Sequence, residues 1–171
     1  LETLEGKQAH QAQKEISNLL RRMEEKDPEL SKVWEETKQW SMDDFKEIYR
    51  WLDIHFDHDF YESDVDEEGR QMVLEGEKNG TFIRSEGAIG IDLETEKLGF
   101  FMLLKSDGNT LYSTKDLALA QRKFDQFSVD RSVYVVGAEQ TLHFKQVFAT
   151  LNRMGYSQAE RCYHLPYALV M

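Results

Sequence analysis

A phenol and a carboxylate stand four residues apart in the stretch DGNTLYSTKDLALAQ, residues 107–121, as Tyr112 and Asp116. A carboxylate on a rigid element beside a phenol forms a planar, bidentate receptor for a guanidinium or another cation. A structural alternative exists, because a carboxylate in the first turn of a helix favours the helix dipole, and Thr114 would then cap that helix. The residue types therefore indicate either a cation site or an ordinary helix start.

A second group of polar residues lies in GAEQTLH, residues 137–143. Gln140 and His143 are three apart and would share one face of a helix, and Gly137 would leave room for a ligand to approach. A surface pair without a ligand is the alternative. Ligands of open α/β sheets collect beyond the carboxyl ends of the strands, so the two groups together predict a pocket there.

The elements that would position these residues alternate regularly after residue 99. We expect a strand at 99–105, a turn at 107–109, a short strand through Tyr112, a helix at 115–126, a strand ending at Gly137, a helix at 139–154 and a strand in RCYHLPY, 161–167. This order predicts an open α/β sheet. The unbroken apolar run at 133–136 predicts a central parallel strand covered on both faces.

The chain before residue 99 predicts two further segments, 1–53 and 54–98. The first is expected to be helical, with a break at Pro28, a new helix start at Ser41 and apolar rows that pack into a core. These rows are Ile16, Leu19, Leu20 and Met23; Leu30, Val33 and Trp34; and Phe45, Ile48, Tyr49 and Leu52. The second should hold an acidic helix at 66–78, ended by Gly80, and short strands at 81–85 and 88–93. The acidic run at 57–68 lacks the central glycine of a calcium-binding loop, so no metal ligands are assigned.

The bulk composition narrows the class of protein. The 171 residues carry a formal net charge of -11, which disfavours a general nucleic-acid-binding surface, and one cysteine, which excludes an internal disulfide. No apolar run approaches the roughly 18 residues of a membrane span, so we expect a soluble, cytoplasmic protein without a membrane partner. The chain begins at Leu1 and ends in HLPYALVM, which we interpret as a piece of a longer protein.

Two stretches in order closely resemble the arginyl-tRNA synthetases. These class I enzymes contain a Lys-x-Asp-Gly-x-x-Leu-Tyr-x-Thr-Arg/Lys-Asp-Leu stretch, matched at 105–117, and a Val-Val-Gly-x-x-Gln-x-x-His-Phe stretch, matched at 135–144. The resemblance implies an α/β fold: the second half of a Rossmann-type parallel sheet at 99–171, with a helical N-terminal segment and a small inserted strand region.

The resemblance also implies roles for particular residues. Tyr112, Asp116 and Gln140 would hold arginine, and His143 would line the same pocket towards the amino acid or ATP. No residue is assigned as catalytic, because the enzyme would act by positioning substrates. The implied reaction is the activation of arginine by ATP with Mg²⁺, followed by transfer to the tRNA for arginine.

The sequence also departs from this family. No HIGH motif and no KMSKS-like loop is present, and the family's Gly-Glu-Ser element is replaced by DFYES at 59–63, so residues 57–65 are not assigned to the site. A glycine of the family is replaced by Ala168. The chain alone is therefore expected to be inactive.

Two other functions remain open from the residues alone. The chain would be a non-catalytic module that binds a partner through the helices of 7–53, or a class I synthetase for another amino acid. Asp116 argues against a synthetase for another amino acid, because a neutral or acidic substrate would gain nothing from a carboxylate at that position.

Overall fold

The computed structural model describes residues 6–168, without the side chains of residues 6–9, 20 and 24. The chain divides into two compact units, Leu1–Asp59 and Phe60–Met171. No helix within the described residues is long and apolar enough to cross a membrane.

The first unit holds helices α1 (Gly6–Glu24) and α2 (Pro28–Trp51). Asp27 caps α2, because its carboxylate accepts hydrogen bonds from the backbone N–H groups of Glu29 and Leu30, both at 3.1 Å. The pKa of Asp27 lies below its ordinary value, mainly because of the hydrogen bond from the backbone of Leu30 and next because of one from the Arg22 side chain. The predicted helix break at Pro28 is confirmed.

Two expectations for this unit are wrong. No new helix begins at Ser41, because α2 runs through it and the Ser41 hydroxyl donates back to the carbonyl of Thr37 at 3.2 Å. The apolar rows do not form a core, since α2 contains no buried residue, and Ile16 and Val33 are 47% and 55% exposed. The two helices offer each other too little apolar surface to bury these rows. Leu20 lies outside the described side chains.

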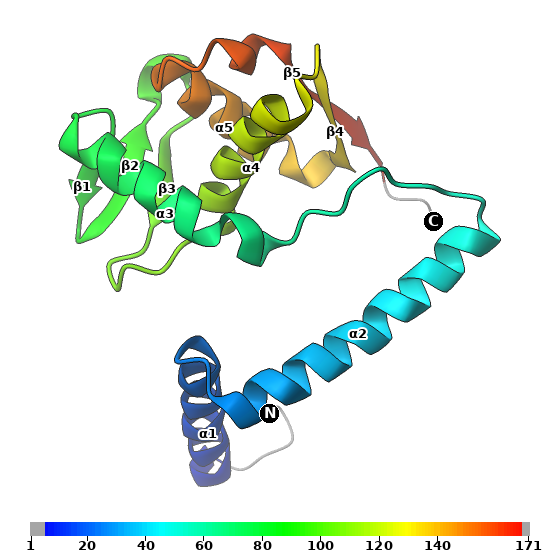
Figure 1. The fold of residues 1–171 in the computed structure, drawn as a ribbon. Coiled ribbons are helices and arrows are strands. Elements are labelled where there is room, and N and C mark those ends of the chain that lie inside the picture. Colours follow the sequence, from blue (N-terminus) through cyan, green and yellow to red (C-terminus); the bar gives the residue numbers. More distant parts are fainter. Residues whose placement is uncertain (1–5, 169–171) are drawn as a thin grey trace. The chain divides into compact units, whose positions relative to one another are not determined.

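The second unit carries the remaining elements. In chain order they are α3 (Glu62–Lys78), β1 (Ile83–Ser85), β2 (Ala88–Asp92), η1 (Glu94–Glu96), β3 (Phe100–Leu104), α4 (Tyr112–Phe127), β4 (Ser132–Gly137), η2 (Ala138–Gln140), α5 (Thr141–Arg153), η3 (Ser157–Arg161) and β5 (Cys162–Tyr167). Helices α4 and α5 lie between the sheet β1–β2–β3 and the strand pair β4–β5, and α3 packs along α4 (Figure 1). The strands predicted at 81–85, 88–93 and 99–105 are confirmed, and the acidic helix begins at Glu62 instead of residue 66.

The sheet topology differs from the prediction of one open parallel sheet. Strands β1, β2 and β3 pair antiparallel, and only β4 and β5 are parallel among the described strands, with Ser132 opposite Cys162. Strand β3 therefore belongs to a different sheet from β4, and a Rossmann-type parallel sheet is not established here. The apolar run of β4 is covered on one face only, since Tyr134 is 9% exposed but Val135 is 63% exposed.

One hydrophobic core holds the second unit together. It is built from α3, the strands β2 and β3, α4 and α5, and its most buried members include Val73, Phe82, Leu93, Leu103, Leu117, Val147 and Leu151. Gly76 is required where Phe82 crosses α3, because a Cβ at this position would lie 2.2 Å from the Phe82 ring. Residues on both sides of position 99 thus share one core, so the acidic helix and its strands support the helices that follow.

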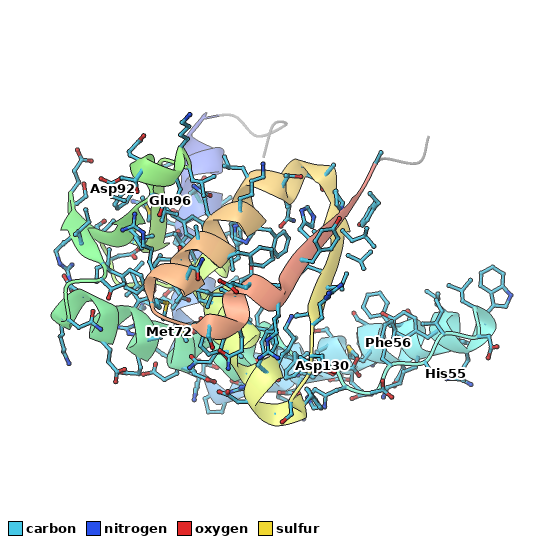
Figure 2. All side chains as sticks on the ribbon, turned by 90° about the horizontal axis from the view of Figure 1, so that it is seen from above. His55, Phe56, Met72, Asp92, Glu96 and Asp130 are labelled. Atoms are coloured by element: carbon cyan, nitrogen blue, oxygen red, sulfur yellow. The ribbon has the colours of Figure 1, made fainter. Side chains whose placement is uncertain are left out.

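An ion pair ties η1 to the C-terminal end of α5. The Arg153 guanidinium donates to Glu96 at 2.7 Å, and Glu96 and Asp92 lie on the same edge of this unit (Figure 2). The hydrogen bond from Arg153 lowers the pKa of Glu96 from 4.5 to about 2. A carboxyl group with a depressed folded-state pKa stabilises the fold above its unfolded pKa, and this contribution is lost as the pH falls towards the folded-state value.

Glu96→Gln is therefore expected to lower the urea midpoint modestly at neutral pH, because both partners are on the surface. The difference from wild type should shrink as the pH falls from 4.5 towards about 2. Urea unfolding at several pH values measures this, with Glu160→Gln as a control at an exposed carboxylate. A difference that stays constant over this pH range would contradict the prediction.

Candidate functional site

The start of α4 is anchored to the end of β3 by two buried hydroxyl groups. The Ser113 hydroxyl donates to the carbonyl of Met102 at 2.8 Å, and the Thr114 hydroxyl donates to the carbonyl of Leu103. These bonds satisfy strand carbonyls that would otherwise lack partners, and they hold the first turn of the helix against the sheet. The orientation of Tyr112, the first helical residue, therefore follows from the position of β3.

The connection from β3 to α4 is a tight turn, as predicted for residues 107–109. Gly108 has a φ of 84°, in the left-handed region that glycine adopts without strain. The backbone N–H of Asn109 donates to the Asp107 carboxylate at 3.0 Å. The predicted short strand through Tyr112 is wrong, because only a single bridge between Thr110 and Leu104 follows the turn.

Helix geometry places Tyr112 and Asp116 on one face of α4. The helix begins at Tyr112, so Asp116 is one turn further along, and residues spaced i, i+4 are neighbours on a helix surface. Thr114 contributes to the cap of α4, as the structural alternative predicted, since its hydroxyl oxygen accepts a hydrogen bond from the backbone N–H of Leu111 at 3.4 Å. Asp116 takes no part in this cap and lies beyond the first turn, which contains no acidic residue.

Tyr112 and Asp116 line a small cavity of about 80 Å³. Its wall is formed by the start of α3 and the first turns of α4: Phe60, Tyr61, Glu62, Val65, Tyr112, Lys115, Asp116 and Leu119. A water molecule requires about 10–15 Å³ on a comparable measure, so the cavity has room for a small planar group. The Asp116 side chain is 28% exposed, so its carboxylate remains accessible to a ligand.

The lysine in this wall is neutralised by two carboxylates from α3. The Lys115 ammonium lies 2.8 Å from Glu62 and 3.7 Å from Asp66. The Glu62 hydrogen bond is the main cause of the raised pKa of Lys115, which therefore stays protonated. Because its charge is compensated, Lys115 opposes a cationic ligand less than an unpaired lysine would.

Residues 60–62 were not assigned to the site from the sequence, yet the structure places all three on the cavity wall. Their contribution comes from the packing of α3 along α4, where a Cβ on Gly69 would lie 2.7 Å from the carbonyl oxygen of Thr114. The only sequence signal was the position of DFYES, which corresponds to an acidic element of the resembled family.

His143 lies behind the cavity and does not belong to the residues that line it. Its Nε2 atom is 2.6 Å from Oδ2 of Asp116, and its ring centroid is 4.6 Å from that of Tyr112. The side chain is only 7% exposed and also contacts the rings of Phe101 and Phe144. The structure thus brings together Tyr112, Asp116 and His143, although His143 faces the core.

Gln140 is placed differently from His143. It ends η2 immediately before α5, and its side chain is exposed, so the two residues do not share the same surroundings. Its predicted role in holding arginine stays a prediction.

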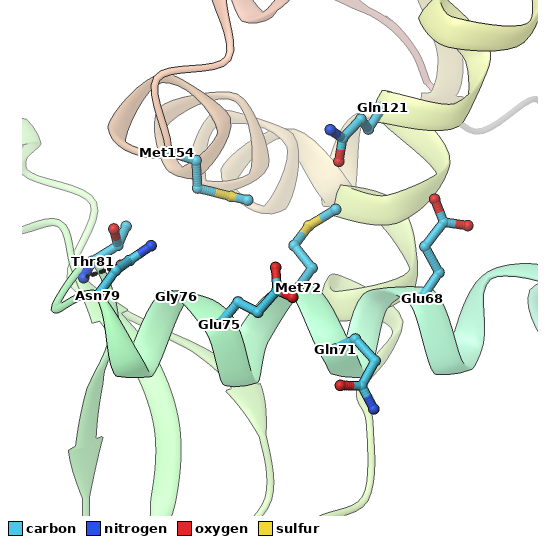
Figure 3. Close-up of a pocket in the computed structure, with 9 residues that line it drawn as sticks. All are labelled: Glu68, Gln71, Met72, Glu75, Gly76, Asn79, Thr81, Gln121 and Met154. Carbon is cyan, nitrogen blue, oxygen red and sulfur yellow. Dashed lines mark hydrogen bonds between the residues drawn. The ribbon is translucent and has the colours of Figure 1, made fainter.

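A larger hollow of about 370 Å³ lies further along α3 (Figure 3). Met72 and Met154 meet across it, and Glu75 and Glu68 point from α3. Glu68 is already paired with Arg122. Since no phenol lines this hollow and one of its carboxylates is already paired, the smaller cavity is the better candidate for cation recognition.

No group of three or more His, Cys, Asp or Glu side chains that could hold a metal ion occurs within residues 6–168.

The structure is an α/β chain in which a phenol and a carboxylate of α4 line a small cavity beside the start of α3. Residues 5–171 match the family described as tRNA synthetases class I (R), catalytic domain. The chain belongs to this family of arginyl-tRNA synthetase catalytic domains.

Individual relatives agree with this assignment. An arginine–tRNA ligase of Bdellovibrio bacteriovorus is 46% identical over 156 residues, which cover 91% of this chain and 27% of the relative. One of Bacteroides thetaiotaomicron is 34% identical, over 97% of this chain and 28% of the relative. The crystal structure of arginyl-tRNA synthetase from Plasmodium falciparum has a similar fold, with a TM-score of 0.79 and 21% identity, over 95% of this chain and 29% of that one. The chain thus spans little more than a quarter of these relatives.

Proposed function

We propose that this chain forms the part of an arginine–tRNA ligase that receives the side chain of arginine. The observation that carries the proposal is the cavity in which Tyr112 and Asp116 from one helix face meet Glu62 from another. Asp116 accepts hydrogen bonds from the guanidinium, and the phenol ring of Tyr112 covers its planar face. Family membership and the arginine–tRNA ligase activity for which the relatives are named support the reaction class.

The geometry favours arginine over lysine. A guanidinium is planar and presents a rigid fork of donors that matches a carboxylate in a bidentate way, whereas an ammonium is a compact point charge. Lysine would leave one of the cavity's polar groups without a partner, and unpaired buried polar groups reject a substrate strongly.

The complete reaction requires parts that this sequence lacks. Arginine is activated by ATP, which brings Mg²⁺ as its complex, and the arginyl group then passes to the tRNA. In this proposal Gln140 contributes to holding arginine from the start of α5, and the cytoplasm is the site of the reaction.

The test is pyrophosphate exchange by the full-length protein that contains this chain, with ATP and the tRNA present. Arginine should support exchange, and lysine should be used at least about 100-fold less efficiently. The chain alone should show no exchange, because it carries neither HIGH nor KMSKS elements. Equal use of lysine, or no dependence on arginine, would refute the proposed substrate and favour a partner-binding role.

A further inference from the structure

His143 occupies a position that its predicted role as a pocket residue does not explain. It is 7% exposed and does not line the cavity among the described residues, yet it touches two of the side chains proposed to hold arginine, Tyr112 and Asp116. Its ring packs against Tyr112 with 4.6 Å between centroids, and its Nε2 lies 2.6 Å from Asp116. One residue of α5 therefore supports two residues of α4.

The tautomer of His143 follows from its surroundings. An ionised carboxylate only accepts hydrogen bonds, so Nε2 must carry the hydrogen in the contact with Asp116. The other ring nitrogen, Nδ1, is buried and has no hydrogen-bond partner among the described residues. A ring with its hydrogen on Nδ1 would leave a buried donor unpaired and would turn the Nε2 lone pair towards the carboxylate. The contact therefore requires the Nε2–H form.

This hydrogen bond fixes the rotation of the Asp116 carboxylate. A carboxylate has about four positions that accept a hydrogen bond, two on each oxygen. His143 occupies one position on Oδ2, so the other position on Oδ2 and both on Oδ1 stay available for a ligand. The ring of His143 is itself held by contacts with Phe101 and Phe144. A receptor held before binding loses less conformational entropy when the ligand arrives.

On the basis of the proposed function, we infer that His143 is a positioning residue for arginine recognition, which orients the Asp116 carboxylate through Nε2–H and supports the Tyr112 ring from behind. It does not touch the substrate. Its effect falls on arginine affinity and on discrimination against lysine, while ATP binding is independent of it.

Two amide variants of the full-length ligase separate this role from simple core packing. In His143→Gln the amide nitrogen can reach the position of Nε2, whereas in His143→Asn the shorter side chain places it nearer to Nδ1 and away from Asp116. We expect His143→Asn to raise the KM for arginine roughly 10- to 100-fold and to reduce discrimination against lysine, with the KM for ATP unchanged. His143→Gln should restore most of the arginine affinity.

His143→Phe provides a third variant, because it keeps an aromatic ring against Tyr112 and removes the donor. It should resemble His143→Asn, and if it fails to fold, the comparison of the Gln and Asn variants decides the question. Equal KM values for arginine in the Gln and Asn variants, or a parallel rise in the KM for ATP, would overturn the inference.

Other results would refute the proposed function itself, independently of the role of His143. If the wild-type ligase does not depend on arginine, the substrate assignment is wrong. If it does, but Asp116→Asn has wild-type kinetics, the site assignment is wrong, irrespective of the His143 variants.

Discussion

Asp116→Asn is expected to reduce kcat/KM for arginine by about 30-fold to several thousandfold in the full-length ligase, since losing one partner of a hydrogen-bonded charge pair costs about 2–5 kcal/mol. The substitution keeps the shape of the side chain and removes its charge. It also replaces one acceptor oxygen by a donor that faces the guanidinium. The Tyr112 ring and the cavity remain, so the loss is specific to charge recognition. Steady-state kinetics with arginine, lysine and ATP measure it.

The matched control is Asp125→Asn, which makes the same change on the same helix at an exposed position outside the cavity. It should leave arginine kinetics within about twofold of wild type, as surface substitutions usually do. If both variants lose activity to the same degree, the effect comes from the net charge of α4. Unchanged kinetics in Asp116→Asn would remove the guanidinium site.

Leu117→Ala should destabilise the second unit by about 2–5 kcal/mol, because it opens a cavity at a completely buried position. Leu117 has 0% exposure and belongs to the core shared by α3, the antiparallel sheet, α4 and α5. Its neighbour Asp116 faces the site, so this turn of α4 connects the core with the candidate cavity. Urea unfolding of the chain, followed by circular dichroism, gives the change in free energy of unfolding.

Leu142→Ala removes the same atoms from a helix position that is 55% exposed. Its free energy of unfolding should lie within about 0.5 kcal/mol of wild type. Equal destabilisation by the two variants would mean that Leu117 is not a core residue in solution.

Local signals in the sequence predicted the elements well where the required residues are adjacent in the chain. The turn at 107–109 is formed by Asp107, Gly108 and Asn109 themselves, and Pro28 begins α2 directly after its cap. The rows of apolar residues predicted helical structure correctly, but they predicted neither that α2 continues through Ser41 nor which rows are buried. In α2 the pattern is helical and the residues are exposed, because burial depends on a second surface that periodicity does not specify.

In the candidate site, too, the sequence predicted residues that are close together in the chain and missed contacts between distant ones. Tyr112 and Asp116 were predicted from their residue types at a strand–helix junction and from the motif of the resembled family. Only the structure shows that both lie on α4, where i, i+4 spacing makes them neighbours. Glu62 and His143 joined them only through packing, since they lie on α3 and α5 and approach α4 from different directions. Distant residues leave no spacing signal. The family resemblance predicted that His143 lines the pocket, but its side chain is buried against Phe101 and Phe144 and is absent from the cavity wall.

The sequence by itself determined the family, the turn at 107–109, and the phenol and carboxylate that follow this turn, because each depends on residue types at short, fixed separations. Only the tertiary structure decided the pairing of the strands. Hydrogen bonds between β3 and β2 place β3 in an antiparallel sheet, while β4 pairs with β5 alone. It also decided that Asp116 is held from behind, because that contact joins residues 27 positions apart through the packing of α5 on α4.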